Sequence, residues 1–497
     1  MSLIKKLAGQ TAIYGLTTII GRFINYWLTP IHTSGILSIS AYGMLTNVYA
    51  YVAFLNIIYT YGLETAYFRF ATKSENQGQK PYNNAFTSIL ISSVVFSGLI
   101  WTLAPQIAVL LGFQGNEQTI RWVAIILASD AIVAVPFAKL RLLNKIYLFA
   151  GAKISNIILN YVLNLFFLII CPMIVEQGLF PELLPFVKSF YNVNSAIEYI
   201  FISNLLANIV YLPFLLPVAK GIRFSIDFRL WKEMFVYAFP IFLMGIPGMV
   251  NEMFSRIMIE KWLPIGFYAG KTSMEALGVF GASYKLSVFM VIATQAFKYA
   301  SEPFFFSNSK DKNAPILFAK VMNYYVLATM TIFLVVCVNI NWIAEIFIGQ
   351  INFREALHIV PLLLIANLFF GIYFNLSVWY KLTDKTYWGT YITFGGAVIT
   401  VVANYILIPI AGYDGSVLAT FICYFSMALA SYYFGQKYFP VPYSLFKISV
   451  YLIVGIILIN IYWFAKLEGT QALISGNLLV ISFVILGLLY EKLRPIT

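Results

Sequence analysis

The sequence predicts an all-α polytopic membrane protein, and three observations support that class. Of the 497 residues, 61% are hydrophobic and only 10% are charged, whereas an ordinary soluble domain carries about 25% charged residues. The mean hydropathy is +0.82. Apolar runs of the roughly 20 residues needed to span a membrane recur along the whole chain. A soluble protein could not bury so much apolar surface, so most of it is expected to face lipid.

About fourteen such runs can be counted, and no remaining stretch is long enough for a separate soluble domain. The longest connections are Glu176–Glu198 and Ser307–Lys320. Many runs end in Tyr or Trp, which favour the headgroup level of a bilayer. The expected helices begin near Leu7, Tyr42, Ala85, Ile120, Tyr147, Tyr199, Phe235, Leu277, Val321, Leu357, Tyr387, Gly415, Leu445 and Leu473.

Lysine and arginine residues orient the expected bundle. With a cytoplasmic N-terminus, the inner loops collect roughly 21 basic residues and the outer loops only about 5 or 6, a strong positive-inside bias. The net charge of +12 is therefore explained as a topology signal, and no nucleic-acid partner is expected. An even number of spans places both termini in the cytoplasm.

An internal repeat is found when the chain is shifted by 238 positions. Gly43 then meets Gly281, Glu64 meets Glu302, and several aromatic residues coincide. The match pairs the second expected helix with the eighth. Both helices run in the same direction, so the repeats are parallel, and such carriers bind their substrate between the two lobes.

The repeat predicts two pseudo-symmetric six-helix lobes followed by two extra helices. We expect an N-terminal lobe over residues 1–220, a C-terminal lobe over residues 221–440 and the additional helical pair over residues 441–497.

Several segments resemble one family of carriers. "GRFINYWLTPI" from Gly21, "YGLETAYFRF" from Tyr61 and "SDAIVAVPFAKLRLLNK" from Ser129 resemble the polysaccharide-flippase (O-antigen type) branch of the multidrug/oligosaccharidyl-lipid/polysaccharide (MOP) exporter superfamily, whose fold is MATE-like. Arg256 looks like an arginine often found late in the seventh helix of that family. The resemblance implies a two-lobed, fourteen-helix carrier. Its substrate would be an undecaprenyl-pyrophosphate-linked oligosaccharide, moved from the cytoplasmic to the periplasmic leaflet by alternating access.

The same resemblance implies a setting. The protein would lie in the bacterial cytoplasmic (inner) membrane and serve lipopolysaccharide O-antigen, capsule or exopolysaccharide biosynthesis. Membrane lipids, a polysaccharide polymerase and a chain-length regulator would be its partners. A lipid II-type flippase and a cation-coupled multidrug exporter of the same superfamily are alternatives. A membrane glycosyl polymerase is less favoured, because its only candidate catalytic loop, Glu176–Glu198, holds a single basic residue.

Arg22 lies near the middle of the first expected helix. A guanidinium there costs at least about 2.5–3.5 kcal/mol on insertion scales, so an intramembrane arginine is a site candidate by default. It either pairs with a buried acid such as Asp130 or binds an anionic headgroup, since its fork of donors matches phosphate oxygens. Arg256 is its expected counterpart in the second lobe, with Glu252 one helical turn away as an alternative local partner.

Three lysines also fall within expected spans. Lys153, Lys285 and Lys298 either extend their flexible stems to the membrane surfaces or form a basic ladder along a central cavity. Residue type alone makes Asn25, Tyr26, Asn47, Asn56, Asn160 and Asn164 candidates for the polar lining that would receive sugar hydroxyls.

The acidic residues have less certain partners. Asp130 is expected to be a counter-ion for Arg22 or Lys153, and the alternative is a proton or Na⁺ site that couples transport to a gradient. An inner gate is expected where the first and second lobes approach, with Glu64 or Glu302 pairing to Arg69, Lys139 or Arg141 across the lobes. Lys298 belongs to the same end and could instead pair with Glu302.

No enzyme chemistry is visible in the sequence. The three cysteines are dispersed among separate apolar runs, there are two histidines, and no P-loop or nucleophile motif is found. We therefore expect no catalytic residue, metal or cofactor, and a proton gradient, a Na⁺ gradient or the membrane potential as the energy source.

Overall fold

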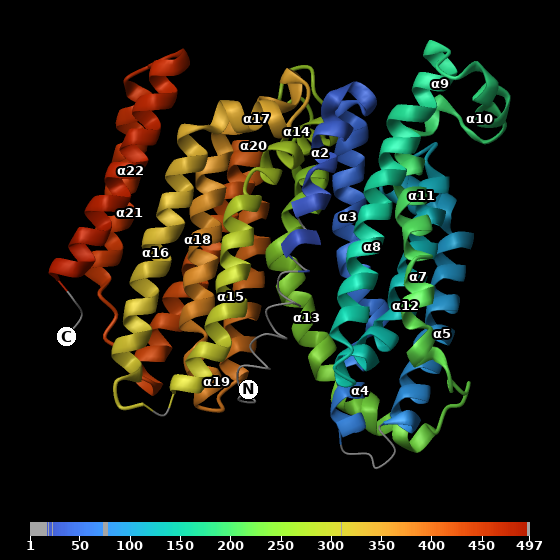
Figure 1. Ribbon diagram of the computed structural model, residues 1–497, viewed down its shortest axis with the longest axis horizontal. Coiled ribbons are helices and arrows are strands. Elements are labelled where there is room, and N and C mark those ends of the chain that lie inside the picture. The colour runs from blue at the N-terminus through green and yellow to red at the C-terminus, as the bar shows by residue number, and fades with distance from the viewer. Residues whose placement is uncertain (1–16, 18, 22, 73–77, 310, 495–497) are drawn as a thin grey trace. The chain divides into compact units, whose positions relative to one another are not determined.

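A computed structural model describes residues 17, 19–21, 23–72, 78–309 and 311–494 (Figure 1). The described residues form helices and connecting loops, without a strand. Among the described residues, eleven helices are long and apolar enough to cross a membrane, or twelve if the bent pair Ser273–Lys285 and Val288–Asn308 is one span. The prediction of an all-α polytopic membrane protein is confirmed.

Two features account for the difference from about fourteen expected spans. Element α20 (Tyr387–Tyr438) covers 52 residues but consists of two helices that meet at Gly412, where φ is 58° and ψ is −134°. The rings of Trp388 and Phe434 lie 4.0 Å apart, so the second helix runs back along the first, and the separate helices expected from Tyr387 and Gly415 are both present. Most of the first expected helix lies outside the described residues.

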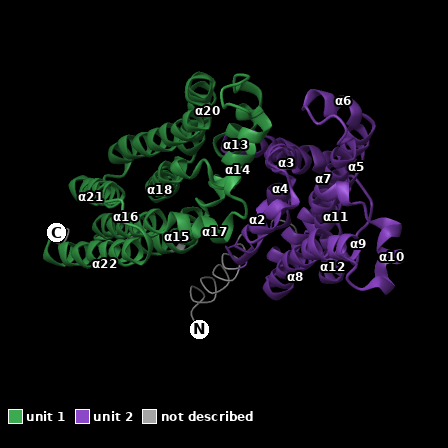
Figure 2. Cartoon of the chain, turned by 90° about the horizontal axis from the view of Figure 1, so that it is seen from above, with its two compact units in different colours: residues 1–15, 250–497 green, residues 16–249 purple. Residues whose placement is uncertain are grey.

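The chain divides into two compact units, which Figure 2 shows in different colours. We call them the N-unit, whose described residues end at Met249, and the C-unit, whose described residues begin at Val250. The division lies within α13 (Phe228–Trp262). The lobe boundaries at 220/221 and 440/441 refer to the repeat and stay a prediction.

The N-unit is a bundle around α7 (Glu117–Leu142). The long helices α5 (Gln79–Thr102) and α11 (Ala196–Asn208) pack against α7, and α11 also packs against α8 (Ile146–Leu165). The apolar residues of α7 that face these neighbours are buried. The other elements are α2 (Leu28–Ile31), α3 (Ile39–Thr60), α4 (Leu63–Thr72), α6 (Ala104–Leu110), α9 (Cys171–Gln177), α10 (Leu184–Phe190) and α12 (Tyr211–Ala219).

The C-unit has its core at α18 (Val360–Leu376), which packs on α20, on α15 (Val288–Asn308) and on α16 (Ala314–Val338). Its two last helices are held by α16: α21 (Leu445–Phe464) and α22 (Gly469–Leu493) both pack against it. The remaining helices are α14 (Ser273–Lys285), α17 (Ile340–Phe347) and α19 (Val378–Leu382).

A buried ion pair anchors this terminal hairpin. Lys447 and Glu491 are 7% exposed each, and their Nζ and Oε2 atoms are 3.0 Å apart. Tyr451 Oη and Asn323 Nδ2 donate to Glu491 Oε1 at 2.7 and 3.1 Å. Because Asn323 belongs to α16, the carboxylate joins α21, α22 and α16.

The end of α3 shows why this helix stops. Ser38 caps its start by accepting a hydrogen bond from the Ala41 amide at 3.1 Å. At its other end Tyr61 and Gly62 have φ of 30° and 75°, which interrupts the helical hydrogen bonds before α4 begins. A Cβ on Gly62 would lie 2.7 Å from the Ala238 carbonyl oxygen of α13, so the close approach of these two helices requires glycine.

Prolines inside the spans do not end them. Helix α7 continues through Pro136, and α13 continues through Pro240 and Pro247. Proline is tolerated inside membrane helices because neighbouring groups satisfy the freed carbonyls.

A seven-residue turn occurs once in each unit. "RLLNKIY" from Arg141 links α7 to α8, and "KLTDKTY" from Lys381 links α19 to α20. Asn144 and Asp384 have φ of 54° and 55°. The amide five residues after Leu140 bonds to its carbonyl at 2.9 Å, and the equivalent bond to the Tyr380 carbonyl is 2.8 Å. The two helix ends therefore share one local geometry. Asn144 and Asp384 are 240 positions apart, two more than the shift of 238 that aligns Glu64 with Glu302, so the two turns correspond if two residues are inserted between these points.

Candidate functional site

A polar cavity of about 710 Å³ lies within the N-unit. Its walls come from α3, α4, α7, α8, α11, α12 and the N-unit part of α13. We call it the N-unit cavity. Its polar and charged lining residues are Asn56, Thr60, Glu64, Asp130, Arg141, Lys153, Asn156, Asn204, Asn208 and Tyr211.

Helical spacing brings these residues to one side of each helix. Asn56 and Thr60 lie four positions apart on α3, which places them on one face. Glu64 follows the break at Tyr61 and Gly62, at the start of α4, and lines the same cavity. Asp130 and Arg141 lie eleven positions apart on α7, about 16 Å at 1.5 Å per residue. The cavity therefore runs along α7 from the middle of this helix to its C-terminal end.

Two asparagine side chains form a hydrogen-bonded chain that ends at Asp130. Asn208 Nδ2 donates to Asp130 Oδ1 at 2.8 Å and to Ser129 Oγ at 2.9 Å. Asn156 Nδ2 donates to Asn208 Oδ1 at 3.0 Å. These bonds connect α8, α11 and α7, and they present N–H groups to the carboxylate.

Lys153 is the cation at the same depth. Its Nζ lies 4.3 Å from the centre of the Phe137 ring and 4.9 Å from that of Tyr211. Tyr211 Oη accepts a long hydrogen bond from Nζ at 3.4 Å. Asp130 attracts this ammonium, although no direct ion pair joins the two described side chains. The ammonium is thus held by aromatic faces, an arrangement that stabilises a cation without neutralising it.

The opposite end of the cavity contains a direct ion pair. Arg141 Nη2 contacts Glu64 Oε1, and both side chains are about one-third exposed. The Arg141 guanidinium also lies over the rings of Phe68 and Phe149, 5.1 and 5.9 Å from their centres. Arg141 was one of the expected partners of Glu64. The expectation of a lobe-to-lobe pair is wrong here, because both residues belong to the N-unit.

The other two expected partners of Glu64 bond elsewhere. Arg69 lies over the Tyr237 ring at 4.1 Å, and Lys139 donates to Gln79 Oε1 at 3.0 Å. Arg69 therefore contacts α13 and Lys139 contacts α5. Their part in an inner gate stays a prediction.

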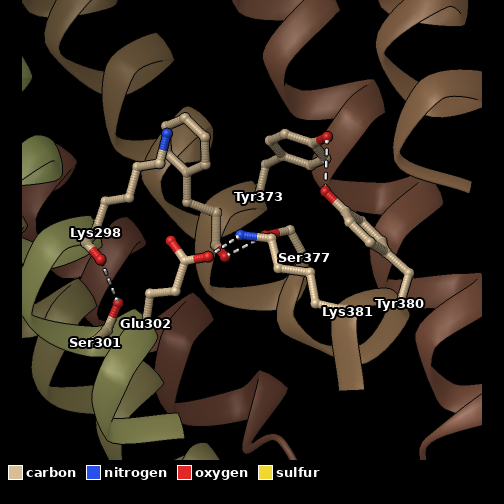
Figure 3. Close-up of polar contacts among 8 residues, drawn as sticks. Lys298, Ser301, Glu302, Tyr373, Ser377, Tyr380 and Lys381 are labelled. Carbon is tan, nitrogen blue, oxygen red and sulfur yellow. Dashed lines mark hydrogen bonds and ion pairs between the residues drawn. The ribbon is translucent and has the colours of Figure 1, made fainter. Parts of the chain in front are cut away.

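The C-unit holds a counterpart of this ion pair, shown in Figure 3. Lys381 Nζ donates to Glu302 Oε1 at 2.8 Å. Lys298 points to the Phe374 ring, 4.4 Å from its centre, and Tyr373 and Tyr380 share a hydrogen bond of 3.3 Å between their hydroxyls. Glu302 thus bonds to Lys381, a partner that the sequence did not indicate.

Arg256 lies in a second cationic cluster of the C-unit. Its Nη1 donates to the Glu252 carbonyl oxygen at 2.7 Å, and its guanidinium lies over the Tyr284 ring at 4.3 Å. Lys285 is close enough for the two positive charges to repel each other. The acceptor on Glu252 is its main-chain carbonyl, so this hydrogen bond does not involve the Glu252 carboxylate.

The remaining expected site residues are dispersed. Arg22 lies outside the described residues. Asn25 is exposed and Tyr26 is half-buried, and neither lines the N-unit cavity. Of the asparagines proposed for the polar lining, Asn56 contributes. Asn164 is instead buried and bonded to Asn160 and His32, while Asn47 is fully buried.

Five polar cavity residues were not singled out from the sequence: Thr60, Asn156, Asn204, Asn208 and Tyr211. Their spacing carried a signal. Asn204 and Asn208 are four positions apart within one apolar run, and Asn156 follows Lys153 by three positions, so each pair shares a helix face. No group of three or more His, Cys, Asp or Glu side chains in the described part of the chain is arranged to hold a metal ion.

Comparison with solved structures identifies the fold. The lipid II flippase MurJ in an inward closed conformation aligns with a TM-score of 0.70 over 97% of this chain and 99% of its own, at 12% identity. An inward-facing multidrug resistance MATE family transporter of the MOP superfamily aligns with a TM-score of 0.62 over 86% and 95%, at 15% identity. The bent form of the Vibrio cholerae MATE transporter VcmN aligns with a TM-score of 0.55 over 90% and 99%, at 15% identity.

No protein-family model and no curated protein sequence matches this chain. The structural likeness therefore establishes the class by fold alone. The protein is a multi-pass membrane protein with the MATE/MOP-like fold, to which a lipid flippase and multidrug transporters also belong.

Proposed function

We propose that this protein is a MOP-type flippase that moves an undecaprenyl-pyrophosphate-linked oligosaccharide from the cytoplasmic to the outer leaflet of the bacterial inner membrane. The single observation that carries the proposal is the N-unit cavity, a charged space of about 710 Å³ within a bundle of apolar helices. Such a space has no role in a purely structural bundle, because uncompensated polar groups at membrane depth are costly.

The lining suits the two parts of such a headgroup. Lys153 and Arg141 supply cations for phosphate oxygens, and Asn56, Asn156 and Asn204 are among the amides that can exchange hydrogen bonds with sugar hydroxyls. A sugar head cannot cross hydrocarbon unaided, because its hydroxyls would lose water without replacement bonds. The polyprenyl tail would stay in lipid during the passage.

The charges also bear on the competing functions. The cavity carries two acidic and two basic side chains, whereas a drug exporter for cations would be expected to present an excess of acid. A lipid II-type flippase remains the second candidate, favoured by the MurJ likeness over 97% of the chain, which takes in most of residues 441–497. Both candidates handle a polyprenyl pyrophosphate, and no enzymatic step is invoked in either.

The wider setting follows from the same proposal. Both termini would be cytoplasmic, a polysaccharide polymerase and a chain-length regulator would act after the flip, and a proton gradient, a Na⁺ gradient or the membrane potential would supply energy.

Depletion of the protein from bacterial cells tests the proposal. Lipid-linked oligosaccharide should accumulate in the inner leaflet and surface polysaccharide should fall. Re-expression of the Lys153→Arg variant should restore more export than Lys153→Ala at equal protein level, since the charge is retained. Accumulation of lipid II in place of lipid-linked oligosaccharide would assign the second candidate function, and unchanged levels of both lipids would refute the flippase proposal.

A further inference from the structure

The N-unit cavity is formally neutral, and its four charges are arranged unequally. Glu64 and Arg141 form a direct ion pair. Asp130 and Lys153 share the other end of the cavity without direct contact, Asp130 bonded to an amide and Lys153 to aromatic groups. The Asp130 carboxylate and the Lys153 ammonium can still stabilise each other without direct contact, because charges interact over longer distances in a low-dielectric site. The second pair is therefore open to an entering ligand.

We propose that binding of a substrate phosphate at Lys153 is accompanied by uptake of one proton by Asp130. This inference rests on the proposed function, and it concerns the protonation state of the cavity when the substrate binds. An anion that engages the ammonium removes the compensating charge of Asp130. A buried carboxylate without compensation is costly, and it becomes neutral by taking a proton from water.

The local geometry accommodates the neutral carboxyl. Asn208 Nδ2 donates to Oδ1, so Oδ1 keeps its bond and Oδ2 carries the proton. A Na⁺ ion would need several oxygen ligands in place of this donor. Because Asn208 directs its NH₂ group to Asp130 and its oxygen to Asn156, the amide chain favours a proton over a metal cation.

Other charged and titratable groups around Asp130 are few. Tyr49 of α3, Lys153 of α8 and Tyr211 of α12 face it. Glu64 of α4 and Arg141 of α7 lie further along the cavity, while α5, α6 and α11 contribute no charged side chain to the described lining. Asp130 is thus the carboxylate nearest to the cation that a ligand would occupy.

Calorimetry on the full-length protein in lipid nanodiscs tests the inference, with farnesyl pyrophosphate as the probe. Binding is measured in buffers of different ionisation enthalpy, which gives the number of protons exchanged per ligand bound. We expect about one proton more for the unchanged protein than for Asp130→Asn. With rising pH, the affinity of the unchanged protein should fall about tenfold per pH unit more steeply than that of the variant. The difference between the two proteins cancels any proton exchanged by the pyrophosphate itself.

Glu117→Gln is the matched control, because Glu117 begins the same helix and lies outside the cavity. It should keep the full proton uptake. Equal uptake in the unchanged protein and in Asp130→Asn would overturn the inference and leave the proposed function intact. A dependence of binding on Na⁺ concentration in place of pH would overturn it in the same way. Absence of any pyrophosphate binding by the unchanged protein would overturn the proposed function as well.

Discussion

Lys381 donates to Glu302 across 2.8 Å, and this pair has the same construction as the pair of Arg141 with Glu64. The two carboxylates coincide in the sequence repeat. The two cations open the equivalent turns that follow α7 and α19. Each pair therefore joins the second helix of its repeat to the end of the fourth helix of the same repeat, within one unit.

The Glu302–Lys381 pair should contribute little to stability. Its side chains are 41% and 28% exposed, and partly exposed ion pairs are worth about 0.2–1 kcal/mol. A double-mutant cycle with Glu302→Gln and Lys381→Met, followed by chemical unfolding in detergent, should give a coupling energy in that range. A coupling energy above about 2 kcal/mol would mean that the pair is shielded from water and contributes more to the stability of the protein than its exposed fraction implies.

Arg141 should matter for transport more than for folding. Arg141→Ala removes one of the two cations of the N-unit cavity, so export of surface polysaccharide should fall at least about tenfold, the effect of losing about 1.4 kcal/mol of binding. Arg141→Lys keeps the charge and should retain part of the export. Export by Arg141→Ala equal to that of the unchanged protein, at equal amounts of protein in the membrane, would remove Arg141 from the substrate path.

Lys447 should be essential for docking the C-terminal hairpin. Lys447→Met leaves Glu491 charged and buried, which costs about 3–5 kcal/mol. The added change Glu491→Leu should recover most of that loss, because no charge is then left alone. Lys492→Met, an exposed neighbour, is the control and should change stability by less than about 0.5 kcal/mol. Thermal unfolding in detergent measures all three, and a Lys447→Met protein as stable as the control would contradict the assignment.

Gly412 should tolerate no side chain. Its backbone conformation favours glycine, and an added Cβ would lie 2.2 Å from the Tyr268 hydroxyl. Gly412→Ala should therefore cost about 1–3 kcal/mol from backbone strain alone. Gly395 lies within the first helix of α20, and an added Cβ there meets nothing within 4 Å, so Gly395→Ala should be neutral or stabilising. Comparing the unfolding midpoints of the two variants checks this, and similar midpoints would show that α20 adjusts at its kink.

Arg22 gives a prediction that depends on the sequence alone. Arg22→Ala should abolish surface polysaccharide while the protein still inserts normally, because the guanidinium is expected to bind the pyrophosphate. Quantitative immunoblotting of membranes serves as the insertion control. Full export by the variant would exclude Arg22 from the mechanism.

The fold class was accessible from the sequence because composition decides it: 61% hydrophobic residues leave no soluble alternative. The equivalence of Glu64 and Glu302 could also be predicted, because a repeat is found by comparing the sequence with itself. The side chains that surround Asp130 could not be predicted from the sequence. Whether Asn208 faces Asp130 or lipid depends on how α11 rotates against α7, and that rotation is set by the packing of many side chains. For the same reason Asn164 could not be distinguished from Asn56 by residue type.

The paired turns at Asn144 and Asp384 have a historical consequence. Asparagine and aspartate tolerate a left-handed backbone less well than glycine, so neither position is the cheapest solution to ending a helix. That both halves retain this second-best choice, at matching places and followed in each case by lysine, is what copying of one half-length gene and fusion of the two copies would leave behind. Under that history, the two units would have diverged around a shared helix-end geometry.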